Sequence, residues 1–324
     1  ITGDFQNEGT ISVESGATLT LNGSNQQVVQ AAGLIETFGT GQVLQTSGRF
    51  TFTGGETSGA VRLTGTEVFI ANTVTSTSTV RVVGDGNVFL GNDAPNVTVW
   101  LEGNTANGFS QLFVDQDTVN HGIIRMETSS ADGADRSTYL ITRNNAKLIN
   151  ASDGRIESYA GAGWYRRLNG VFVNRGRIDA FTTTYITTGT LEADGGTYSD
   201  QFFVAGANIK VTSSAAPNLI RIVGDGSHLI SDNLLNMTLF LDGNPTTGFA
   251  RLYVDEGFVN HGIIRMETTS TDGADRSTHL TATSGTLVNA SDGRIEVQAG
   301  QGWNRYITGD FQNEGTISVE SGAT

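Results

Sequence analysis

The stretch FVNRGRI, residues 172–178, decides the fold of this chain. It places an asparagine after an apolar residue, a glycine shortly after the asparagine, and an isoleucine after the glycine. Variants of this pattern occur along the whole sequence, and they read FQNEGTI from Phe5, TVNHGII from Thr118, LINASDGRI from Leu148, FVNHGII from Phe258 and LVNASDGRI from Leu287. Recurrence of one short motif at a regular period is typical of repeat architectures.

The asparagines of this motif set the length of the repeat. Within two runs, Asn120 to Asn174 and Asn260 to Asn313, they recur at intervals of about 24 to about 30 residues, with the longer step from Asn120 to Asn150 and the shorter step from Asn150 to Asn174. The step from Asn289 to Asn313 repeats the shorter interval. A unit of this size, with two or three short strands, cannot bury an apolar face alone, but it can do so by stacking on its neighbours.

The local pattern predicts strands rather than helices. Short alternating runs such as NVTVWL, residues 96–101, are broken by Gly, Asn and Asp, and no longer window keeps helical spacing of apolar residues. We therefore predict an all-β, right-handed parallel β-solenoid, with apolar side chains inside and adjacent coils about 4.8 Å apart. At roughly 25 residues per coil, one large repeat, 1–306, makes about 12 coils.

The motif asparagines are expected at equivalent corners of successive coils. Asparagine tolerates the left-handed backbone conformation, and its side chain can hydrogen-bond the backbone of the next coil. The predicted corner residues are Asn7, Asn120, Asn150, Asn174, Asn260, Asn289 and Asn313.

Repetition also exists at two larger scales. Residues 108–138 and 248–278 match at 23 of 31 positions, which defines a longer sub-repeat, 1–167, and a shorter one, 168–306. Residues 307–324 are identical to residues 1–18, so we interpret them as the start of the next 306-residue repeat. The alternative is a single repeat extended by a few residues.

Most of the length difference between the sub-repeats lies in one place. The stretch from Ile11 to Gly48 is longer than the corresponding stretch from Ile178 to Gly189 by about 26 residues, which is the size of one coil. The longer sub-repeat is therefore expected to contain one added coil.

Composition excludes several classes of protein. The net charge is −14 and the arginines are scattered, which argues against a nucleic-acid partner. The chain has no cysteine, hence no disulfide framework or thiolate metal site, and no apolar run long enough to span a membrane. Because the sequence starts with Ile1 rather than Met, we expect it to be a segment of a longer protein.

The repeated FVNRGRI, FVNHGII and FQNEGTI resemble the steps of bacterial surface proteins with a β-helix, such as filamentous haemagglutinin-like adhesins and autotransporter passengers. The resemblance implies a secreted or cell-surface location and transfers no binding residue. The function expected is a structural or adhesive rod of an extracellular fibre. Its expected partners are further copies of the same repeat, in one chain or end to end, and surface polysaccharide.

A polysaccharide lyase or hydrolase is the alternative function, because parallel β-helices also carry clustered carboxylates that cleave glycans. The candidates lie around the DGADR segments, together with the turn histidines: Glu127, Asp132, Asp135, Arg136, Glu267, Asp272, Asp275, Arg276, His121 and His261. Since the acidic segments recur in both sub-repeats, we interpret them as polar loops with an Asp-Gly turn and a paired arginine. The histidines are expected to face solvent. No catalytic residue is therefore predicted.

Trp164 and Trp303 each follow a Gly-rich segment of the form GxGW. They are candidate ligand contacts, as exposed platforms for a sugar ring in a carbohydrate-binding module, and packing against a cap or a neighbouring rod is the alternative. No metal site or cofactor is predicted. Calcium at the GDG turns, residues 84–86 and 224–226, is the one alternative, although the Gly-Gly-x-Gly-x-Asp nonapeptide of calcium-binding β-rolls is absent.

Overall fold

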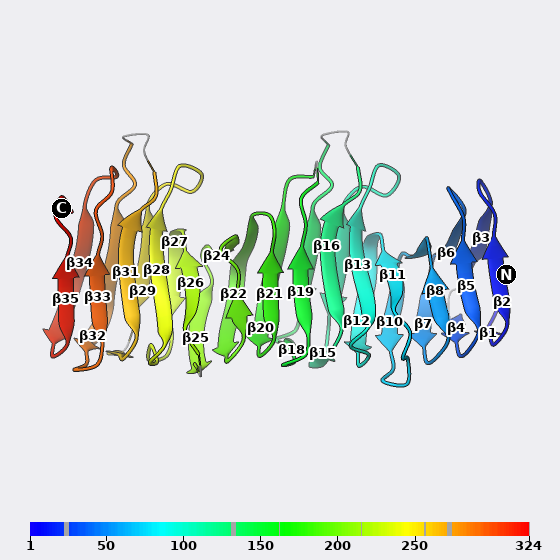
Figure 1. Cartoon of the computed structure of the whole chain (residues 1–324), viewed down its shortest axis with the longest axis horizontal. Helices are drawn as coiled ribbons and strands as arrows, with labels where there is room; N and C mark the ends of the chain where they lie inside the picture. The colour runs from blue at the N-terminus through cyan, green and yellow to red at the C-terminus, as the bar shows by residue number, and fades with distance from the viewer. Residues whose placement is uncertain are drawn as a thin grey trace. The chain divides into compact units, whose positions relative to one another are not determined.

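A computed structural model describes residues 1–22, 26–130, 134–161, 163–214, 216–255, 257–270 and 274–323. The chain divides into two compact units, which are described separately. Unit 1 comprises Ile1–Phe172 and Gly176–Thr184, and unit 2 comprises Val173–Arg175 and Tyr185–Thr324 (Figure 1). The regular elements of the described residues are all β-strands, so the predicted all-β class is confirmed. Accordingly, no described helix is long and apolar enough to cross a bilayer.

The strands up to β21 belong to unit 1, apart from the end of β20. They are β1 (Phe5–Asn7), β2 (Thr10–Val13), β3 (Thr18–Leu21), β4 (Gln27–Gln30), β5 (Leu34–Thr37), β6 (Gln42–Gln45), β7 (Gly48–Phe52), β8 (Glu56–Ser58), β9 (Val61–Leu63), β10 (Thr66–Ile70), β11 (Ser78–Val82), β12 (Gly84–Asn92), β13 (Val97–Gly103), β14 (Ser110–Val114), β15 (Thr118–Asn120), β16 (Ile123–Thr128), β17 (Thr138–Thr142), β18 (Lys147–Asn150), β19 (Arg155–Ser158), β20 (Arg166–Asn174) and β21 (Arg177–Ala180).

The strands from β22 onward belong to unit 2, apart from the first residue of β22. They are β22 (Thr184–Asp194), β23 (Thr197–Tyr198), β24 (Phe202–Val204), β25 (Asn208–Ser213), β26 (Asn218–Ile222), β27 (Gly224–Leu229), β28 (Met237–Gly243), β29 (Ala250–Val254), β30 (Val259–Asn260), β31 (Ile263–Thr268), β32 (Thr278–Asn289), β33 (Arg294–Val297), β34 (Arg305–Asn313) and β35 (Thr316–Val319).

Strands pair in parallel with strands from the next stretch of chain, not with their immediate sequence neighbours. In unit 1 one parallel series runs β3, β6, β9, β11, β13, β16, β19 and β21. A second series begins with β1, β4, β7, β10 and β12, and a third contains β2, β5 and β8. Unit 2 repeats this arrangement, for example in β26, β28, β31, β33 and β35.

A single column of paired positions runs through unit 1. Each member is in register with the next, and the members are Asn7, Gln30, Phe52, Ile70, Asn92, Asn120 and Asn150. We call the chain between two successive members a layer. The shortest layer runs from Phe52 to Ile70 and the longest from Asn120 to Asn150, because the loops between strands differ in length while the strands stay in register.

The core is built largely by alternation of buried and less buried residues along the strands. In β13, Val97, Val99 and Leu101 are fully buried, whereas Thr98 and Trp100 on the opposite face are half-buried. Branched and aromatic side chains suit this pleated, one-sided environment. The alternation explains why a chain with few apolar residues still has a continuous core.

The glycine of the repeated motif is required by a close approach between layers. A Cβ atom added at Gly154 would lie 2.2 Å from the main-chain oxygen of Asn120, and one added at Gly293 would lie 2.1 Å from that of Asn260. Neither glycine needs a positive φ. The motif therefore keeps glycine because only a residue without a side chain fits against the preceding layer.

Candidate ligand-binding loops and grooves

The motif asparagines form a hydrogen-bonded column in the interior of unit 1. The side-chain Nδ2 of Asn120 donates to Oδ1 of Asn150 at 3.0 Å and to the main-chain oxygen of Arg155 at 3.3 Å. Asn7 begins the column by donating to Oε1 of Gln30 at 2.7 Å. Asn7 and Asn120 thus each donate to the next layer, whereas Gln30 and Asn92 donate to main-chain oxygens a few residues later in the chain.

Unit 2 contains the same column in a longer uninterrupted run. Asn233 donates to Asn260 at 2.7 Å, Asn260 to Asn289 at 2.7 Å, and Asn289 to Asn313 at 2.8 Å. Asn174 donates to the main-chain oxygen of Thr197 at 3.2 Å.

The backbone of these asparagines differs from the expectation. Left-handed φ values among described non-glycine residues belong to Asn144, Asn145 and Asn236, not to the motif asparagines. The expectation was wrong because each motif asparagine is the last residue of a strand and acts through its side chain. Sequence analysis also missed Asn92 and Asn233. Their signal is a second asparagine three or four positions later, before VT or MT, in NDAPNVT and NLLNMT.

Trp164 is held in solvent by a buried arginine. Arg166 is only 2% exposed, and its guanidinium donates to the main-chain oxygens of Tyr159 and Gly163 at 3.2 and 3.5 Å. Burial lowers the pKa of Arg166, while the charge of Glu127 acts in the opposite direction. The loop is therefore fixed from inside, and the indole of Trp164 remains 63% exposed.

The same loop occurs in unit 2. Arg305 donates from Nη1 to the main-chain oxygens of Gly302 and Trp303 at 2.9 and 2.8 Å, and Trp303 is 57% exposed. Burial also lowers the pKa of Arg305. A large apolar ring kept exposed on a braced loop in both units is the kind of feature that marks a contact surface.

Asp135, in the described part of its DGADR segment, and the following Ser137 support the loop of Trp164. Asp135 Oδ1 accepts hydrogen bonds from the backbone nitrogen and hydroxyl of Ser137 at 3.0 and 2.6 Å, and the Ser137 hydroxyl accepts one from the nitrogen of Tyr165 at 3.1 Å. Asp275 and Ser277 repeat the arrangement. The hydrogen bonds from Ser277 lower the pKa of Asp275.

The other candidate residues around these segments each have a different environment. Arg136 donates to the main-chain oxygen of Asp135 at 3.4 Å, and Glu127 pairs with Arg125 at 2.5 Å. The main-chain oxygen of Arg276, the counterpart of Arg136, accepts a hydrogen bond from the hydroxyl of Thr268 at 3.1 Å. Glu267 is half-buried in β31. Asp132 and Asp272 lie outside the described residues.

The turn histidines each contact one aspartate of the following layer. His121 Nδ1 lies 2.9 Å from Asp153 Oδ1, and His261 Nδ1 lies 2.9 Å from Asp292 Oδ1; both histidines are half-buried and both aspartates are exposed. The hydrogen bond from His261 lowers the pKa of Asp292.

The GDG turns use their aspartates locally. Asp85 Oδ1 accepts a hydrogen bond from the nitrogen of Gly86 at 2.6 Å, and Asp225 does the same for Gly226 at 2.9 Å. Within the described ranges, no group of three or more acidic or histidine side chains is arranged to hold a metal ion.

Arginines and aromatic rings stack across neighbouring strands of unit 1. Trp100 lies between Arg81 and Arg125, whose guanidinium carbons are 4.4 and 4.7 Å from its ring centroids. Glu102, on the same strand, pairs with Arg62 at 3.3 Å and with Arg81 at 3.4 Å. Both faces of Trp100 are therefore occupied, so this ring cannot stack on a ligand.

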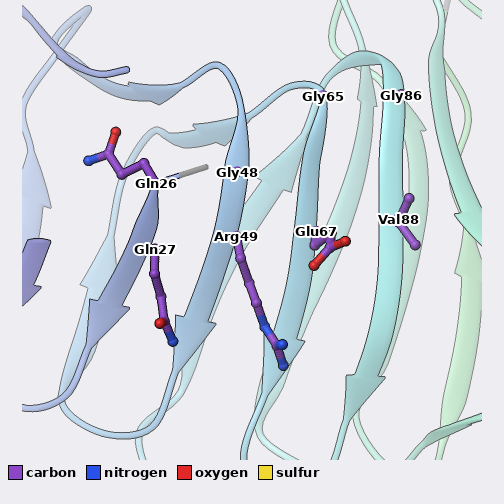
Figure 2. A pocket seen from close by; sticks show the side chains of 8 residues that line it. All are labelled: Gln26, Gln27, Gly48, Arg49, Gly65, Glu67, Gly86 and Val88. Atoms are coloured by element: carbon purple, nitrogen blue, oxygen red, sulfur yellow. The ribbon is translucent and has the colours of Figure 1, made fainter. Parts of the chain in front are cut away.

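Unit 1 also contains an open groove of about 510 Å³, shown in Figure 2. It lies over β4, β7, β10 and β12, and the residues that line it are Gln26, Gln27, Gly48, Arg49, Gly65, Glu67, Gly86 and Val88.

Comparison of the chain with protein-family models, curated proteins and solved structures gave no match.

Proposed function

We propose that this chain is a segment of a structural or adhesive rod in an extracellular, cell-surface fibre. In this proposal both units are stretches of right-handed parallel β-solenoid, with about 12 coils per 306-residue repeat, and each layer is one coil. The cell-surface location follows from the resemblance of the repeated motif to bacterial surface β-helices.

One observation carries the proposal, namely the column of paired positions. Residues one layer apart are in parallel register, and equivalent asparagines donate to each other at 2.7 to 3.0 Å in each unit. A column of this kind can be extended by further layers, because one asparagine side chain can accept from the layer before it and donate to the layer after it, as Asn260 does. A column that can be extended in this way suits a long rod or fibre.

The adhesive part of the proposal is supported by the tryptophan loops. Trp164 and Trp303 are exposed on loops whose main-chain oxygens accept hydrogen bonds from Arg166 and Arg305, so the backbone that carries the rings is held in place before a ligand arrives. A backbone that is already in place loses little conformational freedom on binding. The ligand proposed for them is surface polysaccharide. A carbohydrate-binding module is the alternative that the same loops support.

The test of the rod is how its length grows. Small-angle X-ray scattering of residues 1–324 should give a maximum dimension near the roughly 58 Å expected for 12 coils about 4.8 Å apart, plus loops. A chain with two consecutive copies of residues 1–306 should be longer by about the same amount. If the second copy increased the maximum dimension only by the cube root of the mass ratio, the rod proposal would be wrong.

A further inference from the structure

The groove of unit 1 is lined by one row of paired residues. Gln27 is in register with Arg49, Arg49 with Glu67, and Glu67 with Val88. Paired residues on adjacent strands point to the same face, at a spacing of about 4.8 Å. Figure 2 shows these side chains following one another across the groove.

The polar members of this row keep their hydrogen-bonding capacity free. Gln27, Arg49 and Glu67 are all exposed, and their side chains make no hydrogen bond or ion pair with another described residue. The guanidinium of Arg49 lies over the ring of Phe69, 5.8 Å from its centroid, and so leans away from Glu67. By contrast, Arg265 and its register partner Glu296 in unit 2 do pair, at 3.2 Å.

One end of the groove is open down to the backbone. Gly48, Gly65 and Gly86 follow one another there, each with a positive φ. A Cβ added at Gly86 would lie 3.4 Å from the Cα of Gly65, so these residues form a floor without side chains. Beside it, Gln26 is only 2% exposed, and its amide has no partner among the described residues.

The charged lining is specific to unit 1. In unit 2 the corresponding row consists of Thr190, Asn208 and His228, in the same parallel register. The equivalence follows from the glycines that precede these residues, since Gly48, Gly65 and Gly86 match residues 189, 206 and 226. The same strand pairing therefore forms without an arginine and a glutamate at the positions of Arg49 and Glu67.

We propose that this groove binds a neutral glycan chain. The row offers N–H donors from Arg49 and Gln27 and carboxylate acceptors from Glu67, within reach of one another. Sugar hydroxyls both donate and accept hydrogen bonds, so they can use all three side chains at once. The opposite charges of Arg49 and Glu67 cancel, and the chain carries −14 overall, which disfavours a polyanion. The proposal deepens the adhesive part of the proposed function and rests on it.

The experiment is calorimetric titration of residues 1–324 with neutral linear hexasaccharides, namely cellohexaose, maltohexaose, mannohexaose and xylohexaose, and with hexagalacturonate as the anionic probe. The test variant is the double substitution Arg49→Thr with Glu67→Asn, which gives the groove the residues that unit 2 uses. The matched control is Thr190→Ala with Asn208→Ala in unit 2. A third variant, Trp164→Ala with Trp303→Ala, removes the rings of the tryptophan loops and reports on those loops separately.

We expect at least one neutral hexasaccharide to bind, with at least a tenfold loss of affinity in the double variant and less than a twofold change in the unit 2 control. No binding of any neutral probe, binding of hexagalacturonate alone, or binding that the double variant leaves unchanged would each overturn the proposal. Affinity lost only with the tryptophans would also overturn it. The scattering test of the rod has a separate readout, so the two proposals can fail independently.

Discussion

At the scale of single residues, the motif asparagine is explained by its amide. A carboxamide has a donor and an acceptor at one end of a short side chain, so it can accept from one layer and donate to the next. A serine side chain is too short to reach the next layer, and an ionised aspartate has no hydrogen-bond donor. Asn260 uses both groups of its amide: the oxygen accepts from Asn233, and the nitrogen donates to Asn289 and to the main-chain oxygen of Arg294.

Replacing Asn260 by alanine should therefore be costly. The change removes the donor to Asn289 Oδ1 and the shortest of the hydrogen bonds from Asn233 Nδ2 in a buried column, and a buried polar group left unsatisfied costs about 1–3 kcal/mol. We expect the free energy of unfolding from urea titration to fall by about 2–4 kcal/mol. Asn107→Ala is the matched control, because that side chain is exposed and has no hydrogen bond with another described residue. Equal stability of the two variants would show that the column is not stabilising.

At the scale of strands, the sequence predicted the alternation but not the side-chain stacks. The stacking of Arg81, Trp100 and Arg125 depends on the register of three strands that are separated by unequal intervals along the chain. Because layer length varies, no fixed period brings these residues together in the sequence. The exposed Trp164 was recognisable from its GxGW segment, but the brace from Arg166 depends on the fold of the loop.

Three neighbouring strands of unit 1 share one buried carboxylate, Glu102. Burial raises its pKa, but the hydrogen bond from Ser129 at 2.7 Å and the charges of Arg62 and Arg81 outweigh burial, so the net shift is downward from 4.5. A carboxyl group whose pKa is lower in the folded state stabilises the fold above its unfolded pKa. That stabilisation is lost as pH falls through the folded value.

Glu102→Gln should expose this pH dependence. At pH 7 the variant should be less stable by about 1–3 kcal/mol, less than the loss of a fully buried pair because both arginines are partly exposed. The difference from the parent protein should narrow as pH falls below about 4.5, since the parent then loses the same charge. Urea unfolding at pH 7, 5.5, 4 and 3 measures it. Glu56→Gln, at an exposed carboxylate without a partner among the described residues, should show no such trend, and a pH-independent difference for Glu102→Gln would contradict the assignment.

At the scale of the whole molecule, the sequence predicted the repeated strands, but it did not predict how the layers differ in length and in the side chains that line the groove. The period of the asparagine motif was sufficient to predict an all-β chain, because every layer is too short to bury its apolar side chains except by stacking on its neighbours. It could not predict a layer as short as the one between Phe52 and Ile70, where these two residues replace the amides in the column. The groove of Arg49 and Glu67 could not be predicted for the same reason, since the residues that line it come from four different layers.

The added block of unit 1 allows a test of this layered construction. Ile11 is in parallel register with Ile35, so deleting residues 11–34 removes one whole register interval and joins Thr10 to Ile35 in the position of Ile11. The step that remains from Asn7 to Phe52 is then longer than the layer from Phe52 to Ile70 and shorter than the layer from Asn120 to Asn150, so it lies within the observed range.

The expected result is that one whole layer can be removed without loss of the strand before it. Native-state hydrogen exchange should show the amides of β1 still protected in the deletion of 11–34, now by pairing with β7. Deletion of 11–22 is the control, because it roughly halves the step from Asn7 to Gln30 and leaves too little chain to return to the column. In that control β1 should exchange freely while β7 and later strands keep their protection. Loss of protection in β1 after deletion of 11–34 would mean that layers are not interchangeable, and the repeated design inferred from the asparagine column would have to be abandoned.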